Sequence, residues 1–410
     1  LLICSSNPLK AAPGERVNLC IVGVRGRGMS LAQNFARLPN AQITHVCDVN
    51  EARFGPAIKA ITDIQNAAPE PVRDLRRVLD DKTVDAIVVA TPDHWHALAT
   101  IWGCQAGKHV YVEKPISHNV FEGWQMVQAA RKYDRAVQVG TQSRSVSHYL
   151  EAIEMLRSGK LGRIHMAKAW NSQLRRRVPA VDDSPVPAGI DWDIWQGPAP
   201  NRPYNENRYT YGWRWLWDYG CGDMGNDGVH DLDIARWGLG VDYPLEVSCS
   251  GAKLQFTGDI QETPDTQFVT FKFPDNKMLV YEQRLWSPYQ QEGFTNGVAF
   301  YGNAGYMLIG RRGWKVVERG NKVLIDKQVD FSDPPHLENF LSAVQSGTEL
   351  NCEIEQGYQS TLLAHLGNLS YRVGRPLRFD PATQTLAGDR EANGMLKRRG
   401  RKAFIIPDEV

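Results

Sequence analysis

The stretch NLCIVGVRGRGMSLAQNF, residues 18–35, decides the fold class of this chain. An apolar run typical of a buried strand leads into a glycine-rich turn, and apolar residues then recur at helical spacing. Strand, glycine turn and helix in this order open a dinucleotide-binding unit. The turn departs from the G-x-G-x-x-G pattern, because Arg25 stands where the second glycine belongs and Gly26 comes one place later.

This departure still allows a phosphate site if Gly26 takes a backbone conformation that other residues avoid. Unpaired N–H groups and the dipole at the helix N-terminus favour a pyrophosphate, and the two arginine side chains are available to contact it. The residues that we predict to bind the cofactor here are Gly23, Arg25, Gly26, Arg27 and Gly28. A tight structural turn without a ligand is the alternative.

A carboxylate follows the next expected strand, residues 43–47. Asp48 stands about 20 residues after Gly28, which is the spacing of the acid that hydrogen-bonds the ribose hydroxyls of a dinucleotide. Because a carboxylate repels a 2′-phosphate, NAD is favoured over NADP. The glycine turn and Asp48 together predict an NAD site.

The wider pattern predicts an α/β protein of two domains, because 410 residues exceed what one ordinary core supports. Strand-like and helix-like segments alternate over residues 17–140, which is typical of a parallel sheet. Later strand-like segments follow one another with few helices between them, which predicts a large, mostly antiparallel sheet. We therefore predict a Rossmann domain at 16–143 and an α+β domain for substrate and oligomerisation at 144–410. An aromatic, loop-rich insertion is expected at 171–219.

Composition argues against several classes of protein. A net charge of +1 gives no reason to expect nucleic acid as a partner, and no apolar run reaches the length of a membrane span. The 7 cysteines are scattered without metal or disulfide spacing, and no catalytic metal is expected. Residues 1–15, LLICSSNPLKAAPGE, look like the end of an export signal, which predicts a periplasmic or exported protein. A disordered leader left by processing, on a cytoplasmic protein, is the alternative.

Two further stretches carry the chemistry. They are ATPDHWHALAT…AGKHVYVEKPIS within residues 90–117 and GDMGNDGVHDLDIARW at 222–237. Together with IVGVRGRG, they make the chain resemble the Gfo/Idh/MocA oxidoreductases, the family of glucose-fructose oxidoreductase and inositol dehydrogenase. The resemblance extends over nearly the whole chain. WDIWQGP at 192–198 also resembles a subgroup often found with export signals.

The resemblance implies roles for individual residues. The further positions that it implies for cofactor binding are Thr91, Pro92, His96, Glu113, Lys114 and Gln142. Lys114, in the EKP motif, would contact the substrate hydroxyl beside the nicotinamide, and His230 matches the catalytic histidine. Oxidation of a sugar carbinol sends a hydride to the nicotinamide and a proton to a base, which suits this pair.

Three residues of the insertion are expected to contact the sugar, because aromatic faces stack on sugar C–H surfaces. They are Tyr211, Arg214 and Trp215. A packed aromatic loop without ligand contacts is the alternative reading of the same residues.

One position departs from the inositol-dehydrogenase pattern, in which an aspartate stands four residues before the histidine. Here that position is Asn226, and Asp227 follows it. An asparagine can orient an imidazole but cannot stabilise imidazolium by charge. We therefore expect His230 to be a weaker base that shares the proton with Lys114 or with a nearby acid, Asp227 or Asp231.

Three functions follow from these residues. The leading one is an NAD-dependent oxidoreductase that acts on a sugar, polyol or glycoside with a tightly bound cofactor. The second is a redox glycosidase, which oxidises the sugar, eliminates the aglycone, adds water and reduces the product again. The third is a non-catalytic, NAD-binding regulatory protein. The resemblance also implies a homodimer or homotetramer.

Overall fold

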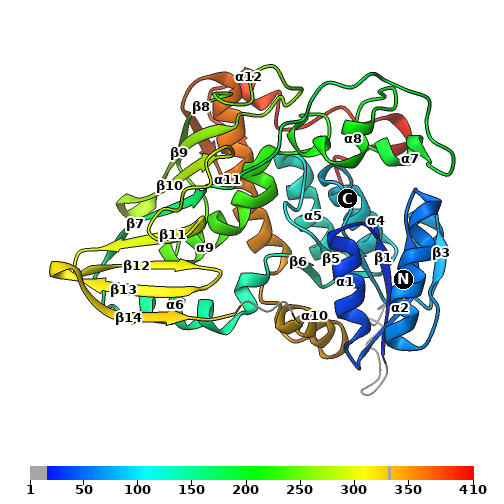
Figure 1. Cartoon of the computed structure of the whole chain (residues 1–410), viewed down its shortest axis with the longest axis horizontal. Helices are drawn as coiled ribbons and strands as arrows, with labels where there is room; N and C mark the ends of the chain where they lie inside the picture. The colour runs from blue at the N-terminus through cyan, green and yellow to red at the C-terminus, as the bar shows by residue number, and fades with distance from the viewer. Residues whose placement is uncertain (1–15, 331–333) are drawn as a thin grey trace, which may run out of the picture.

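The structure of the protein is a computed structural model, which describes residues 16–330 and 334–410. The predicted leader, residues 1–15, lies outside the described residues. Figure 1 shows two lobes, a Rossmann lobe and a lobe built on a second, larger sheet, with helices packed between and around them. The predicted α/β fold class is confirmed.

The first lobe contains a six-stranded parallel sheet with the order β3-β2-β1-β4-β5-β6. Its strands are β1 Val17–Val22, β2 Ala41–Cys47, β3 Glu70–Val72, β4 Ala86–Val89, β5 His109–Val112 and β6 Val137–Val139. The order reverses between β1 and β4, and open α/β sheets bind ligands at the carboxyl ends of the strands beside such a reversal.

Five helices connect these strands. They are α1 Arg27–Ala36, α2 Phe54–Gln65, α3 Leu75–Asp80, α4 Asp93–Gln105 and α5 Val120–Lys132. Helix α1 begins at Arg27, one residue before the start expected from the sequence. Helix α2 was not predicted, because only Ala57 and Ile61 of its residues are buried and the apolar face is narrow.

The second lobe contains a ten-stranded sheet with the order β14-β13-β12-β11-β7-β10-β9-β8-β15-β16. Its strands are β7 Ile164–Asn171, β8 Glu246–Ala252, β9 Thr266–Phe273, β10 Lys277–Arg284, β11 Asn296–Gly302, β12 Gly305–Gly310, β13 Gly313–Glu318, β14 Lys322–Gln328, β15 Leu377–Asp380 and β16 Thr385–Leu386. All neighbours run antiparallel except β7 and β10. Strand β14 was not predicted, since it is an exposed edge strand without apolar alternation.

The helices of the second half serve both lobes. They include α6 Ser147–Arg157, α9 Val229–Leu239, α10 Pro334–Ser346 and α11 Ile354–Val373. Helices α9 and α11 pack against the large sheet and against each other. Helix α10 instead packs on the Rossmann lobe, where Phe340 lies against Phe35 with ring centroids 6.3 Å apart. The two lobes therefore share a continuous apolar interior.

The predicted aromatic insertion runs between β7 and α9 and contains the short helices α7 Trp192–Gln196 and α8 Glu206–Thr210. It crosses back over the Rossmann lobe, as the green segment at the upper right of Figure 1 shows. Two backbone hydrogen bonds join it to the end of β2, from Glu51 N to Gly189 O and from Asp191 N to Val49 O, both at 2.9 Å. The insertion thus lies over the ligand-binding edge of the sheet.

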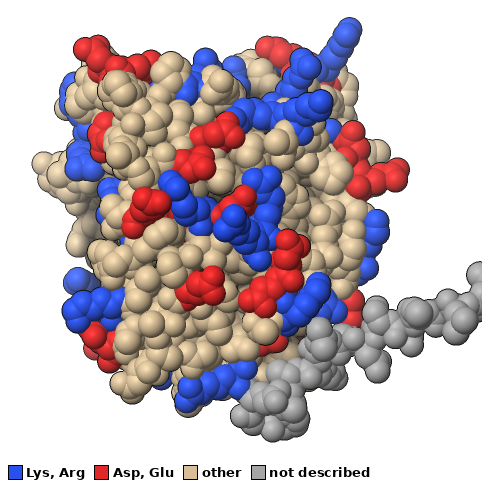
Figure 2. All heavy atoms as spheres, turned by 90° about the vertical axis from the view of Figure 1, so that its right-hand side faces the viewer, with Lys and Arg blue, Asp and Glu red and all other residues tan. Residues whose placement is uncertain are grey.

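The surface on the Rossmann side carries mixed charge. Figure 2 shows basic and acidic side chains interspersed over this face, in keeping with the net charge of +1. Among the described residues, no helix is both long enough and apolar enough to cross a bilayer.

Candidate active site

A cavity of about 930 Å³ lies at the carboxyl ends of the Rossmann strands, beneath the insertion and beside the start of α9. Most of the residues predicted from the sequence line it. Of the cofactor positions these are Gly23, Arg25, Gly26, Arg27, Asp48, Thr91, Pro92, His96, Glu113, Lys114 and Gln142. The predicted catalytic residues Lys114, Asn226, Asp227 and His230 line it as well.

The glycine turn has the conformation that its unusual spacing required. Gly26 has a φ of +47° and precedes the first residue of α1, and Gly23 has a φ of +83°. A Cβ on Gly28 would lie 1.7 Å from the carbonyl oxygen of Gly23. Gly28 is not among the residues that line the cavity, and its lack of a Cβ lets the helix pack closely on the turn.

Asp48 braces this turn. Its carboxylate accepts hydrogen bonds from Val24 N at 3.0 Å and from Asn50 N at 2.9 Å. Burial raises the pKa of Asp48, while these two bonds and the charges of Arg53 and Arg25 oppose the rise. The carboxylate faces the cavity at the end where an adenosine ribose is expected.

The polar groups of the cavity fit an NAD molecule. Thr91 lines the cavity, and its hydroxyl oxygen is buried without a hydrogen-bond partner among the described residues. Glu113 Oε1 accepts from Arg27 Nε at 2.8 Å and from Gln142 Nε2 at 3.4 Å, which fixes its carboxylate beneath the turn. A buried donor left unpaired costs free energy, so the Thr91 hydroxyl is a group that a ligand would satisfy.

His96 is held by the backbone on both sides. Its Nδ1 lies 2.7 Å from Pro115 O and its Nε2 lies 2.8 Å from Thr91 O. Both ring nitrogens are thus engaged within the chain, which makes His96 a brace between two cavity-lining loops.

Lys114 and His230 face the cavity from different lobes. Lys114 follows β5, and its Nζ donates a hydrogen bond to the backbone oxygen of Asn226. His230 lies in the first turn of α9, and burial together with the charge of Lys114 lowers its pKa well below the usual value. The imidazole is therefore neutral at physiological pH, and the same two effects make it a weak proton acceptor.

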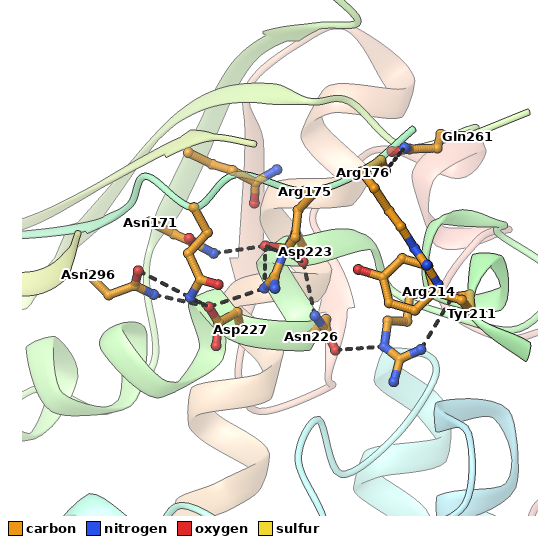
Figure 3. Close-up of polar contacts among 12 residues, drawn as sticks. Asn171, Arg175, Arg176, Tyr211, Arg214, Asp223, Asn226, Asp227, Gln261 and Asn296 are labelled. Carbon is orange, nitrogen blue, oxygen red and sulfur yellow. Dashed lines mark hydrogen bonds and ion pairs between the residues drawn. The ribbon is translucent and has the colours of Figure 1, made fainter. Parts of the chain in front are cut away.

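The side chain of Asn226 is fixed by charged neighbours, as Figure 3 shows. It lies on a π-helical turn, Met224–Gly228, and its Nδ2 donates to Asp223 Oδ1 at 2.9 Å. Its Oδ1 accepts from Arg214 Nε at 3.2 Å. The amide thus presents a donor to one neighbour and an acceptor to the other, which a carboxylate cannot do.

Two acids beside this turn have different environments. Asp227 lines the cavity and accepts a hydrogen bond from Arg175 Nη2 at 3.2 Å. Asp231 is 6% exposed, and burial, followed by the charge of Asp227, raises its pKa well above the usual value. Asp231 therefore holds a proton more readily than an exposed aspartate.

The insertion contributes a different tryptophan from the one predicted. Tyr211 and Arg214 line the cavity, as expected. The prediction of Trp215 as a sugar contact is wrong, because its side chain is 0% exposed and packs with Val178, Phe256 and Leu285. Trp213 lines the cavity in its place. In the sequence WRW the two tryptophans are equivalent, and only the course of the loop decides which one faces the ligand.

Sequence reasoning also missed several charged residues of the cavity, among them Asp93 and Arg311. Asp93 is the first residue of α4, and burial raises its pKa against the effects of His96, Lys114 and Arg214. Its place in TPDHWH, directly after a strand end, was an available signal. Arg311 lies in the turn between β12 and β13, and nothing in the sequence marks it. Within the described parts of the chain, no three His, Cys, Asp or Glu side chains group as metal ligands do.

Comparison with known proteins identifies the two halves of the chain. The model "Oxidoreductase family, NAD-binding Rossmann fold" matches residues 17–141, and "Oxidoreductase family, C-terminal alpha/beta domain" matches residues 168–406. The uncharacterized oxidoreductase YrbE of Bacillus subtilis is 25% identical over 88% of this chain and 96% of its own length. Glycosyl hydrolase family 109 protein 1 of Shewanella sp. (strain ANA-3) is 28% identical over 41% of this chain, and the match spans only 38% of that protein.

Solved structures share the fold. The WlbA dehydrogenase from Bordetella pertussis, crystallised with NADH and UDP-GlcNAcA, superposes with a TM-score of 0.68 at 21% identity over 89% of this chain and 99% of that one. The aldose-aldose oxidoreductase from Caulobacter crescentus gives a TM-score of 0.68 at 18% identity over 89% and 100%. Since the two family models together match most of the sequence, this chain belongs to the Gfo/Idh/MocA family and is an NAD-dependent oxidoreductase.

Proposed function

We propose that the protein oxidises a carbinol carbon of a sugar, polyol or glycoside. The observation that carries the proposal is that Lys114 and a neutral His230 face one cavity whose other end holds the glycine turn and Asp48. A nicotinamide bound there supplies the acceptor for the hydride. The chain's own groups then have to bind the substrate hydroxyl and take its proton.

The proton has two candidate acceptors. In the oxidation, the C–H bond loses a hydride and the O–H bond loses a proton, so one base is needed for each turnover. His230 is neutral and is one acceptor, although its lowered pKa makes it a weak base. The carbonyl of Asn226 holds the ammonium of Lys114 in place as a hydrogen-bond donor to the hydroxyl oxygen. Asp227 lines the same cavity and is the other group that we propose to share the proton.

Tight retention of NAD, export and assembly into a dimer or tetramer are parts of the same proposal. The insertion supports retention, because it is hydrogen-bonded to the end of β2 beside Asp48. Export and assembly rest on the resemblance of the sequence to its family. Fractionation of the native host and light scattering of the purified protein would test them.

A redox glycosidase is the second candidate. It is favoured by the match to glycosyl hydrolase family 109 proteins and by two acids, Asp93 and Asp227, that line the cavity beside Lys114. Elimination and hydration require groups that add and remove protons at a neighbouring carbon, which a pure dehydrogenase does not need.

One experiment separates these functions. The purified protein is incubated without added NAD with free sugars and aryl glycosides, and the products are identified by mass spectrometry. A product lighter by two hydrogens supports the dehydrogenase, whereas a released aglycone with an unoxidised sugar supports the glycosidase. Lys114→Ala should lower either turnover by about a hundredfold or more. Full turnover in that variant would contradict the role of Lys114.

A further inference from the structure

Arg214 occupies an unusual place in the cavity. It lies in the 3-10 turn Gly212–Trp215 of the insertion and lines the cavity beside Lys114 and Asn226. Its guanidinium carbon is 4.3 Å from the ring centroid of Trp213 and 5.2 Å from that of Tyr211. Figure 3 shows the guanidinium of Arg214 below the ring of Tyr211, on the side of the Rossmann lobe.

The hydrogen bonds of this guanidinium go to neutral groups. Nε donates to the amide oxygen of Asn226 at 3.2 Å, and Nη1 donates to the backbone oxygen of Tyr211 at 3.2 Å. Within the described chain, no carboxylate lies within 4.0 Å of it, whereas Arg175 pairs with both Asp223 and Asp227. Burial lowers the pKa of Arg214, which shows the cost of keeping this charge away from water.

The surrounding acids compensate for Arg214 only in part, since the charges of Asp93 and Asp223 oppose the fall of its pKa but burial outweighs them. Lys114 also lines this part of the cavity, and its ammonium donates to the backbone oxygen of Asn226. Asp227 is already paired with Arg175, and burial raises the pKa of Asp93, which favours its neutral form. Arg214 is therefore a largely buried cation that lies beside Lys114 and forms no ion pair with a described residue, and an anion bound between these two side chains would stabilise both charges.

We propose that the substrate carries an anionic group, a carboxylate or a phosphate, which binds the guanidinium of Arg214 while the carbinol lies against Lys114 and His230. The planar fork of arginine suits the two oxygens of such a group, and Trp213 and Tyr211 line the cavity beside it. The inference rests on the proposed oxidation of a sugar and names the class of sugar: sugar acids or sugar phosphates.

The test compares matched probes on the NAD-loaded protein. Glucose, glucuronate and glucose 6-phosphate form one set, and galactose, galacturonate and galactose 6-phosphate form another. Oxidation is followed by NADH absorbance, and binding is measured by calorimetry. In at least one of the two sets, the carboxylate or the phosphate sugar should have a kcat/KM roughly ten- to hundredfold higher than that of the neutral sugar. This ratio corresponds to the free energy of one charge-assisted hydrogen bond. The preference between carboxylate and phosphate distinguishes the two sources of the anion.

Two variants give the controls. Arg214→Gln should abolish the preference, mainly through KM of the anionic probe, and Arg214→Lys should restore part of it. Arg176 lies on the same ring, with its guanidinium carbon 4.1 Å from the centroid of Tyr211, but its side chain is exposed. Arg176→Gln should therefore keep the wild-type preference.

The outcomes separate this inference from the proposed function. Oxidation of neutral and anionic sugars at equal rates, with Arg214→Gln lowering both alike, would overturn the anion site and leave the oxidoreductase. Anion binding that Arg214→Gln removes, without oxidation of any probe, would support the site and contradict oxidation of these sugars. If no probe is bound or oxidised, both the anion site and the proposed oxidation of sugars are overturned.

Discussion

At the scale of single residues, the two side-chain contacts of Asn226 give a physical reason for an asparagine where the inositol-dehydrogenase pattern has an aspartate. Its amide donates to Asp223 Oδ1 and accepts from Arg214 Nε. Asp223 also forms an ion pair with Arg175, whose Nε lies 3.1 Å from Asp223 Oδ1. An aspartate at position 226 would keep the contact with Arg214, but its other oxygen would face the carboxylate of Asp223 where a hydrogen bond now stands.

We predict that Asn226→Asp loses about 1–3 kcal/mol of unfolding free energy at neutral pH. The repulsion raises the carboxyl pKa of the pair in the folded state, so the folded variant binds a proton that the unfolded chain releases. Its stability relative to wild type should fall as pH rises through that raised pKa. Urea unfolding at several pH values measures this. Asn226→Ser, which adds no charge, should shift stability by the same amount at every pH, and a flat profile for Asn226→Asp would contradict the assignment.

Asp231 gives a second pH-dependent prediction. Burial, with the charge of Asp227, raises its folded-state pKa well above the usual value. Wild type should therefore lose stability as pH rises through this pKa, because only the folded state keeps the proton. Asp231→Asn keeps the shape without the charge and should show a smaller fall in Tm between about pH 5 and pH 8. Asp242→Asn is the control, since the Asp242 side chain is 73% exposed. Identical Tm profiles for Asp231→Asn and wild type would show that Asp231 does not titrate as proposed.

At the scale of elements, the packing of α1 on the glycine turn controls the cofactor site. A Cβ on Gly28 would overlap the carbonyl oxygen of Gly23, and backbone cannot move aside as a side chain can. Gly28→Ala should therefore displace the start of α1, cost about 2–3 kcal/mol of stability and weaken NAD binding measured by calorimetry. Gly55→Ala in α2 is the matched control, because a Cβ there meets nothing within 4 Å. Unchanged NAD affinity in Gly28→Ala would disprove this role.

The same scale shows what the sequence could predict. Buried strands such as Ala86–Val89 and the turn at Gly23 were predictable, because burial on both faces and a strand-to-helix glycine turn leave local signals. Strand β14 was missed because its sequence has no alternation of apolar residues. It forms because β13 offers unpaired backbone groups at the edge of the sheet, which the sequence of β14 does not reveal. In the site, Lys114 and His230 were predicted from motifs. Arg311 was not, because only the fold of the second sheet brings the turn between β12 and β13 to the cavity.

At the scale of the whole molecule, the insertion joins the two lobes over the cofactor site. Arg25 of the glycine turn donates from Nη1 to Thr210 O at 3.2 Å, and Asn50 Nδ2 donates to the hydroxyl of Tyr209 at 2.8 Å. Both insertion residues line the cavity. A ligand bound along β1 and β2 is therefore covered by a segment that belongs to the other half of the sequence, and we expect these contacts to slow its release.

Tyr209→Phe removes one such contact while keeping the ring. We expect NAD to dissociate about fivefold faster from this variant, which corresponds to the loss of roughly one neutral hydrogen bond. The rate is measured by loading the protein with NADH and following its fluorescence after a chase with excess NAD⁺. Tyr204 belongs to the same aromatic cluster, but its hydroxyl donates to Glu206 at 2.6 Å within the insertion. Tyr204→Phe should therefore keep the wild-type rate, and equal acceleration in both variants would assign the effect to general loosening of the cluster rather than to the closure over NAD.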